Sequence, residues 1–174
     1  MLPVLSTNRL LLTPRSIEEL EDCLAMDRDP LITRYIPGPW SDSKRHRSFV
    51  LDRMRRRYPS GLGYWSVRGL DGGEFLGWIL LIPYEAFKGE IEIGWRFTLS
   101  NWGRGYATEA AAAVLEHAFK SAHVSAVVAD INPLNHASIR VAEKIGMRYV
   151  GERAVDGELL KWYRLTSNEY QSAA

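Results

Sequence analysis

The sequence has one cysteine, no long apolar run and almost no excess charge. Cys23 alone cannot form an internal disulfide or a cysteine zinc site, so the chain suits a reducing compartment. The absence of a long apolar run argues against a membrane-spanning helix, and the start lacks the pattern of a signal peptide. The formal net charge of +1 gives no overall attraction to nucleic acid or to an anionic membrane. We therefore expect a cytoplasmic protein without dedicated nucleic-acid or membrane partners.

The composition is that of an ordinary globular protein. Apolar residues make up 46% of the 174 residues and charged residues 25%. A chain of this length usually folds as one domain with a self-sufficient core. We find no internal repeat, low-complexity stretch or linker. Residues 1–174 are therefore expected to form a single domain.

The apolar pattern predicts strands and helices in mixed order. Short apolar or alternating runs between turn residues indicate strands, and a capping residue before apolar positions three or four apart indicates a helix. The expected strands are 9–14, 64–68, 75–82, 90–97, 124–131, 148–155 and 158–166. The expected helices are 16–26, 41–58, 108–122 and 135–145. Tight turns are expected at 71–73 and 156–157, and a loop with one short helical turn at 27–40. This order predicts a mixed sheet with helices on its faces.

The stretch Gly103–Thr108 lies between an expected strand and an expected helix. Its glycines permit a tight turn and close approach of the backbone to a ligand, and the first N–H groups of a helix attract an anion. Arg104 adds a charge and Thr108 a hydroxyl, which predicts a pyrophosphate site. The glycines can equally serve an ordinary strand-to-helix turn. The stretch lacks the lysine of a Walker A loop and, at Thr108, the small residue of a Rossmann fingerprint.

Four segments together resemble the GNAT superfamily of N-acetyltransferases, and more narrowly its RimJ/RimL-like branch. Residues 102–110 (Trp-Gly-Arg-Gly-Tyr-Ala-Thr-Glu-Ala) are similar to the acetyl-CoA motif. Residues 7–12 resemble the first strand of the branch, 92–95 its fourth, and 132–147 its Asn-x-x-Ser and Glu-Lys-x-Gly-Phe segment. The resemblance implies an α/β (α+β) fold: a mixed, mostly antiparallel seven-stranded sheet, helices on both faces, splayed between the fourth and fifth strands.

The resemblance also implies the activity and the ligand. An N-acetyltransferase moves the acetyl group of acetyl-CoA to a primary amine by direct attack in a ternary complex, without a metal. The acceptor is then a protein N-terminus or a small-molecule amine, and relatives are commonly homodimers. The resemblance implies that a backbone N–H near residues 95–97 polarises the thioester carbonyl. The positions implied to bind the coenzyme are Trp95, Arg96, Phe97, Gly103, Arg104, Gly105, Tyr106, Ala107, Thr108, Asn135 and Ser138. An acyl-CoA-binding module with little or no catalysis is the alternative, and a nucleotide-binding protein of another fold is a third.

Three carboxylates are candidates for the base that takes the proton of the amine. Glu90 and Glu92 share one face of their strand, and Asp130 stands near the end of the next. Glu92 directly precedes the Ile-Gly-Trp segment and is the first choice. Each carboxylate can instead be solvated or ion-paired. Asn135 is expected to cap a helix and, by the resemblance, to hydrogen-bond the pantetheine arm or a water. The expected catalytic residues are Glu92 and Asn135.

One position departs from the family pattern. Ala142 stands where many relatives have a tyrosine that protonates the leaving thiolate. Water, Ser138 or Tyr163 is then the expected proton donor. Cys23 lies beside acidic residues that raise a thiol pKa, so it is expected to be structural rather than a nucleophile.

The acceptor side is expected near the first helices. Tyr35, Trp40, Trp65 and Trp78 are aromatic residues that can wall a pocket there or belong to the core. Residues 44–57 are strongly basic, with one acid. Such a helix can attract an acidic partner, a ribosomal surface or the coenzyme phosphates, or it can be a solvated face.

Overall fold

In the computed structural model, which describes residues 1–70 and 73–173, eight strands of the described chain form one sheet in the order β1-β2-β3-β4-β5-β6-β8-β7. Neighbouring strands are antiparallel except β5 and β6, which are parallel. The strands are β1 (Leu5–Ser6), β2 (Leu10–Pro14), β3 (Gly63–Gly69), β4 (Phe75–Pro83), β5 (Ile91–Phe97), β6 (Ala126–Ile131), β7 (Arg148–Val155) and β8 (Glu158–Thr166). Of the two expected hairpin turns, the first includes Asp71 and Gly72, which lie outside the described residues.

The expected count of seven strands is wrong by one, because β1 was not predicted. β1 folds back on β2 through a turn in which the Thr7 N–H donates to the Leu10 carbonyl, at 2.9 Å, and the Thr7 hydroxyl accepts from the Leu10 N–H, at 3.0 Å. A two-residue strand is too short to leave an alternating pattern in the sequence. The other seven strands lie where the apolar pattern predicts them, with ends shifted by at most two residues.

The helices also follow their sequence signals. They are η1 (Ile17–Glu19), α1 (Leu20–Asp27), α2 (Pro30–Thr33), α3 (Ser43–Arg55), η2 (Leu99–Asn101), α4 (Tyr106–Lys120), α5 (His136–Lys144) and α6 (Ser167–Ala173). Ser16 forms a capping box with Glu19, and Asp42 caps α3. α3 ends three residues before the expected Tyr58, because the backbone is already extended at Arg56. α6 was not predicted. Within the described chain no helix combines the length and the apolar character needed to cross a membrane.

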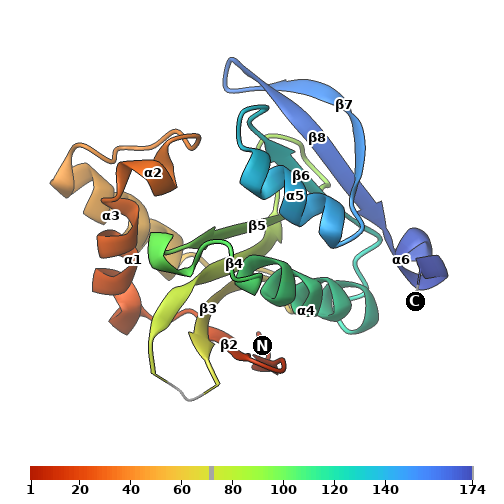
Figure 1. The fold of residues 1–174 in the computed structure, drawn as a ribbon, viewed down its shortest axis with the longest axis horizontal. Coiled ribbons are helices and arrows are strands. Elements are labelled where there is room, and N and C mark those ends of the chain that lie inside the picture. Colours follow the sequence, from red (N-terminus) through yellow and green to blue (C-terminus); the bar gives the residue numbers. More distant parts are fainter. Residues whose placement is uncertain (71–72, 174) are drawn as a thin grey trace.

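The sheet is covered on both faces, as expected. Ile79 and Leu81 of β4 point into a core that includes α4, while Trp78 and Leu80 point into a second core that includes α1 and α3. Figure 1 shows α1–α3 gathered on one side of the sheet and α4 and α5 on the other. Burial of β4 on both faces explains its nearly continuous apolar run.

The sheet opens between β5 and β6, which are the fourth and fifth of the expected strands. In the described chain these two strands are paired at one position only, between Glu92 and Val128. β5 is held along its length by β4, and β6 by β8. The predicted splay is therefore confirmed, and Glu92 stands where it begins.

Gly77 lets β4 approach β5 closely. An added Cβ would lie 2.2 Å from the backbone oxygen of Arg96, and the φ angle of Gly77 is +153°. We expect Gly77→Ala to lower the free energy of unfolding by about 3 kcal/mol or more, because the two strands must separate.

Gly151→Ala is the matched control for this substitution. Gly151 has a φ of +158°, but its added Cβ would meet no atom within 4 Å. Its cost is backbone strain alone, about 1 kcal/mol. Urea unfolding measures both variants. Equal losses of the free energy of unfolding would contradict the close approach of β4 and β5 at Gly77.

Candidate functional site

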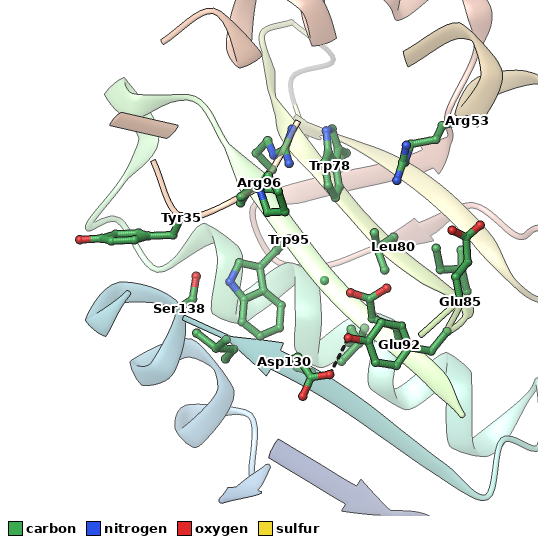
Figure 2. A pocket seen from close by; sticks show the side chains of 18 of the residues that line it. Tyr35, Arg53, Trp78, Leu80, Glu85, Glu92, Trp95, Arg96, Asp130 and Ser138 are labelled. Atoms are coloured by element: carbon green, nitrogen blue, oxygen red, sulfur yellow. Dashed lines mark hydrogen bonds between the residues drawn. The ribbon is translucent and has the colours of Figure 1, made fainter. Parts of the chain in front are cut away.

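A cavity of about 400 Å³ lies on the α1–α3 face of the sheet and reaches the splay. Figure 2 shows side chains from β5, β6 and α5 around one opening. The residues expected from the sequence that line it are Glu92, Trp95, Arg96, Asp130, Asn135 and Ser138. Phe97 is buried in the core on the α4 face. The structure therefore assembles most of the expected strand and α5 positions in one place.

Glu92 lies at the start of the splay, and its carboxylate differs from those of the other two candidate bases. It is paired by its backbone with Val128 of β6, yet no residue of the described chain forms a hydrogen bond or ion pair with its carboxylate. Burial, and then the charge of Asp130, raises the pKa of Glu92 to about 7. Such a group is present in both protonation states near neutral pH, which suits proton transfer.

The other two candidate bases are held in ion pairs. Arg153 Nε lies 2.9 and 3.0 Å from the two carboxylate oxygens of Asp130, and its Nη2 lies 2.8 Å from Glu90 Oε2. The Tyr84 hydroxyl donates to Asp130 Oδ2 at 2.5 Å. Burial and this hydrogen bond raise the pKa of Tyr84, so the hydroxyl keeps its proton. Glu90 and Asp130 are therefore ion-paired with Arg153, whereas the carboxylate of Glu92 has no such partner in the described chain.

Gly94 lies between Glu92 and Arg96 on the same face of β5 and lines the cavity. A Cβ at this position would lie 3.2 Å from Leu80 Cγ on the neighbouring strand. Side chains two residues apart on a strand share a face, so Gly94 adds no side chain to the cavity wall beside Glu92. A larger residue at position 94 would crowd Leu80.

The side chain of Arg96 points away from the splay. Its Nη1 lies 2.7 Å from Asp27 Oδ1, and His46 Nε2 lies 3.3 Å from Asp27 Oδ2. The guanidinium also lies 5.0 Å from the ring centre of Trp40 and 4.9 Å from that of Trp78. These buried contacts fix α1 and α3 against β5. Only the backbone of Arg96 is therefore placed to face a ligand in the splay.

The expected aromatic pocket residues divide between the two faces. Tyr35, Trp40 and Trp78 line the cavity. Trp65 is fully buried in the core on the α4 face, and its Nε1 donates to the Pro3 carbonyl at 2.7 Å. Alternation along β3 places Trp65 away from the cavity and its neighbour Tyr64 in the cavity wall.

The glycine turn adopts the conformation that its glycines permit. Gly103 and Gly105 have φ angles of +72° and +80°. Gly105 directly precedes α4, whose first residues are Tyr106, Ala107 and Thr108, and no side chain of the described chain caps this end. The first N–H groups of α4 therefore remain available to an anion. Residues 103–108 do not line the cavity.

Two residues that the sequence analysis did not single out hold this turn in place. Arg9 Nη1 donates to the backbone oxygen of Arg104 at 3.0 Å, and Arg9 Nε donates to Glu109 at 2.7 Å. The Arg9 guanidinium lies 4.7 Å from the centre of the Tyr106 ring. Arg9 and Glu109 each lie in a segment that carries the family resemblance, but their pairing joins residues 100 positions apart.

α5 brings its expected residues to the cavity. Asn135 caps the helix as predicted, its Oδ1 accepting from the Ser138 N–H at 3.1 Å. Ala142 is fully buried, and its methyl side chain offers no hydroxyl for proton transfer. Tyr163 is also buried in the core and does not line the cavity, so it does not suit the expected proton transfer. Cys23 is buried, and burial raises its pKa to about 12, as expected for a structural thiol.

The sequence comparison decides the family. A family model described as an acetyltransferase (GNAT) domain matches residues 9–148. The chain belongs to the GNAT acetyltransferase family. It is 38% identical to the protein YkkB of Bacillus subtilis over 122 residues, 70% of each chain. It is 28% identical over 157 residues to the FsC-acetyl coenzyme A-N(2)-transacetylase of Aspergillus fumigatus, over 85% of this chain and 66% of that one.

The GNAT fold is shown independently by solved structures. A GNAT-family acetyltransferase from Bacillus anthracis superposes with a TM-score of 0.81 at 28% identity, over 95% of this chain and 99% of that one. The similarity therefore includes the splayed part of the sheet and the helices on both faces.

The raised pKa of Glu92 in this GNAT chain has a consequence for stability. The folded protein binds this proton more tightly than the unfolded chain, so stability is lost as the pH rises from about 4.5 to about 7. Glu92→Gln removes the ionisation. We expect the free energy of unfolding of the variant, relative to the original chain, to be higher at about pH 8 than at about pH 5. Urea unfolding at the two pH values measures this difference.

Glu90→Gln is the matched control. It makes the same chemical change two residues away, in a carboxylate paired with Arg153, and no gain at higher pH is expected. A difference for Glu92→Gln that stays constant between the two pH values would contradict the assignment.

Proposed function

We propose that residues 1–174 form a single acetyltransferase domain that moves the acetyl group of acetyl-CoA to a primary amine, by direct attack in a ternary complex. The observation that carries this proposal is the carboxylate of Glu92 at the opening between β5 and β6, which has a raised pKa and no partner among the described residues. We also propose the RimJ/RimL-like branch as the nearer kinship, on the sequence of residues 102–110. The buried free thiol of Cys23 supports a reducing, cytoplasmic location.

The residues of this chain fit acetyl-CoA as the co-substrate. The open edge of β5 beyond Glu92 offers backbone groups to an extended pantetheine arm, and the uncapped start of α4 offers N–H groups to a pyrophosphate. We propose that Gly103–Thr108 bind the pyrophosphate and that Trp95–Phe97 border the arm. The name of the Aspergillus relative, an acetyl coenzyme A N(2)-transacetylase, supports this donor and an amine acceptor.

Asn135 is placed to hold the arm while it caps its helix. Its Oδ1 accepts from the Ser138 N–H, which leaves the side-chain NH₂ without a partner in the described chain. That NH₂ group can donate to a carbonyl of the pantetheine arm or to an ordered water. Capping fixes the direction of the amide, so the two roles support each other.

Glu92 acts as the base in the proposed reaction. A lysine-like amine is only about 0.1% neutral at pH 7.4. The site must therefore remove a proton from the ammonium group, directly or through a water, before the nitrogen can attack. The neutral amine nitrogen then forms a bond to the acetyl carbon, the carbon–sulfur bond breaks, and the second proton lost by the nitrogen replaces the one that the leaving thiolate takes up. The products are the N-acetyl amine and free coenzyme A thiol. A backbone N–H of residues 95–97 stabilises the charge on the carbonyl oxygen.

The leaving thiolate needs a proton from a group other than residue 142. Ser138 lines the cavity, and we propose this hydroxyl or a water as the donor. Tyr84 is already committed to Asp130. The alternative function, an acyl-CoA-binding module, predicts coenzyme binding without acceptor-dependent thiol release.

Release of free thiol from acetyl-CoA tests the proposed reaction. Peptide N-termini, lysine peptides, amino acids, amino sugars and polyamines form the acceptor panel. We expect acceptor-dependent release whose rate rises with a midpoint near pH 7, the pKa of Glu92. Glu92→Gln is expected to lower kcat by about 100-fold or more and to remove that midpoint, because the base is lost. Glu90→Gln is the control, and this variant is expected to keep the midpoint near pH 7. An unchanged pH profile in Glu92→Gln would contradict the assigned base.

Coenzyme A binding, measured by calorimetry, tests the glycine turn. Gly105→Glu puts a carboxylate at the uncapped start of α4, and we expect affinity to fall by about tenfold or more through repulsion of the pyrophosphate. Gly146→Glu is the matched control, since Gly146 has a similar φ of +87° and open space around it but ends α5. Equal affinities of the two variants would overturn the turn assignment.

A further inference from the structure

Two arginines that line the cavity have no anionic partner among the described residues. The Arg15 guanidinium lies 3.7 Å from the centre of the Tyr64 ring, and its Nε and Nη2 atoms are buried with no hydrogen-bond partner in the described chain. Arg53 of α3 points into the same cavity (Figure 2) and lies 3.8 Å from the centre of the Phe49 ring. No residue of the described chain forms an ion pair with it.

A third polar group belongs to this cluster. The Tyr58 hydroxyl is buried, lines the cavity and has no partner in the described part of the chain. Burial raises the pKa of Tyr58 to about 12, so the hydroxyl stays protonated and can donate. The charges of Arg56, Arg15 and Arg53 all act on the Tyr58 hydroxyl. Arg15, Arg53 and Tyr58 are called the anion cluster below.

Unpartnered buried donors of this kind call for an explanation. Buried polar groups in native proteins are nearly always satisfied, and Arg15 and Arg53 also repel each other. Burial lowers the pKa of Arg15. An anion bound at the cluster would satisfy all three groups at once, because the guanidinium fork matches a carboxylate or a phosphate.

The acids around the cavity do not supply that anion. Asp27, Asp130 and Glu85 are each paired with another arginine. Glu92 feels the charge of Arg53 but forms no ion pair with it. The remaining two acids of the lining are exposed on the β7–β8 hairpin. Within residues 1–70 and 73–173, no acid that lines the cavity is therefore left to pair with the anion cluster.

The sheet sets the distance between Tyr64, beneath the Arg15 guanidinium, and Gly94, which lies two residues from Glu92. The Arg15 guanidinium lies over Tyr64, which pairs with Leu80, which pairs in turn with Gly94. Two strand spacings separate Tyr64 from Gly94, about 10 Å. Tyr64, Trp78 and Leu80 form an apolar stretch of the wall between them. A molecule that reaches both ends needs an apolar middle several bonds long.

We propose that the acceptor is a primary amine that carries a carboxylate or a phosphate at its far end. The anion cluster binds the anionic group, the apolar wall contacts the spacer, and the amine reaches Glu92 where Glu92 and Gly94 line the cavity. This inference rests on the proposed function, since the amine enters the same site. It disfavours polyamines and other polycations, which would place a second positive charge against Arg15 and Arg53.

Binding of reaction products tests the inference without requiring turnover. In the presence of saturating coenzyme A, calorimetry compares 6-acetamidohexanoate, 6-acetamidohexyl phosphate and neutral N-hexylacetamide, with shorter and longer homologues of each. We expect at least one anionic series to bind about tenfold to 100-fold more tightly than the neutral one, the range for charge-assisted hydrogen bonds. The two anionic series distinguish a carboxylate from a phosphate. Equal affinity of all three series would overturn the inference.

Arg53→Gln tests whether the preference comes from the cluster. Arginine and glutamine have similar helix propensities, so α3 should remain folded. We expect the variant to lose most of the preference for the anion and to bind the neutral series as before. Arg55→Gln is the matched control, because Arg55 is on the same helix, is exposed and does not line the cavity. Tyr58→Phe should lose part of the preference. A preference that survives in Arg53→Gln would overturn the assignment.

Thiol release with the matching amines separates this inference from the proposed function. The inference predicts a higher kcat/KM for 6-aminohexanoate or 6-aminohexyl phosphate than for hexylamine, and loss of that ratio in Arg53→Gln. Anion-selective binding with no thiol release from any amine would support the anion cluster and contradict the transferase. Thiol release with equal kcat/KM for charged and neutral amines, together with equal binding, would support the transferase and overturn the anion cluster.

Discussion

The single backbone register between β5 and β6, at Glu92 and Val128, is the constraint on which the rest of the site depends. β5 is fixed by β4, and β6 by β8, so each half of the sheet is internally paired. The opening between them is therefore set by the fold and needs no ligand to form it. Glu92 gains its raised pKa from this position, because it is shielded by the converging strands and faces the charge of Asp130.

Charges around the opening divide into paired and unpaired groups. Asp130 is paired with Arg153, and Asp27 with Arg96, and these buried pairs join separate elements. Glu92 and the anion cluster have no such partners in the described chain. Paired groups hold the walls, while unpaired ones remain able to act on a ligand. This division, more than the residue types alone, distinguishes the two ends of the cavity: one has an unpaired carboxylate, and the other has two arginines and a tyrosine hydroxyl without partners in the described chain.

Local signals were sufficient for much of the fold and for part of the site. Apolar periodicity located seven strands, and the capping residues Ser16 and Asn135 were found from sequence. Glu92 was preferred for its place beside the Ile-Gly-Trp segment, but Asp130 could not be set aside from sequence. Its partner Arg153 is 23 residues away on another strand, and no local pattern encodes that contact. The unpaired state of Arg15 was hidden for the same reason, because it depends on what every other element brings nearby.

Arg153 has a further consequence for the sheet. It holds Asp130 on one side of the splay and Glu90, just before β5, on the other. An ion pair thus ties the two half-sheets together where strand-to-strand hydrogen bonds are missing. Its side chain is only 12% exposed, whereas the surface pair of Arg47 and Glu21 is 51% and 67% exposed. Dissolved ions screen buried charges far less than exposed ones, so the width of the opening should hold steady across ionic strengths that weaken the surface pairs of the same protein.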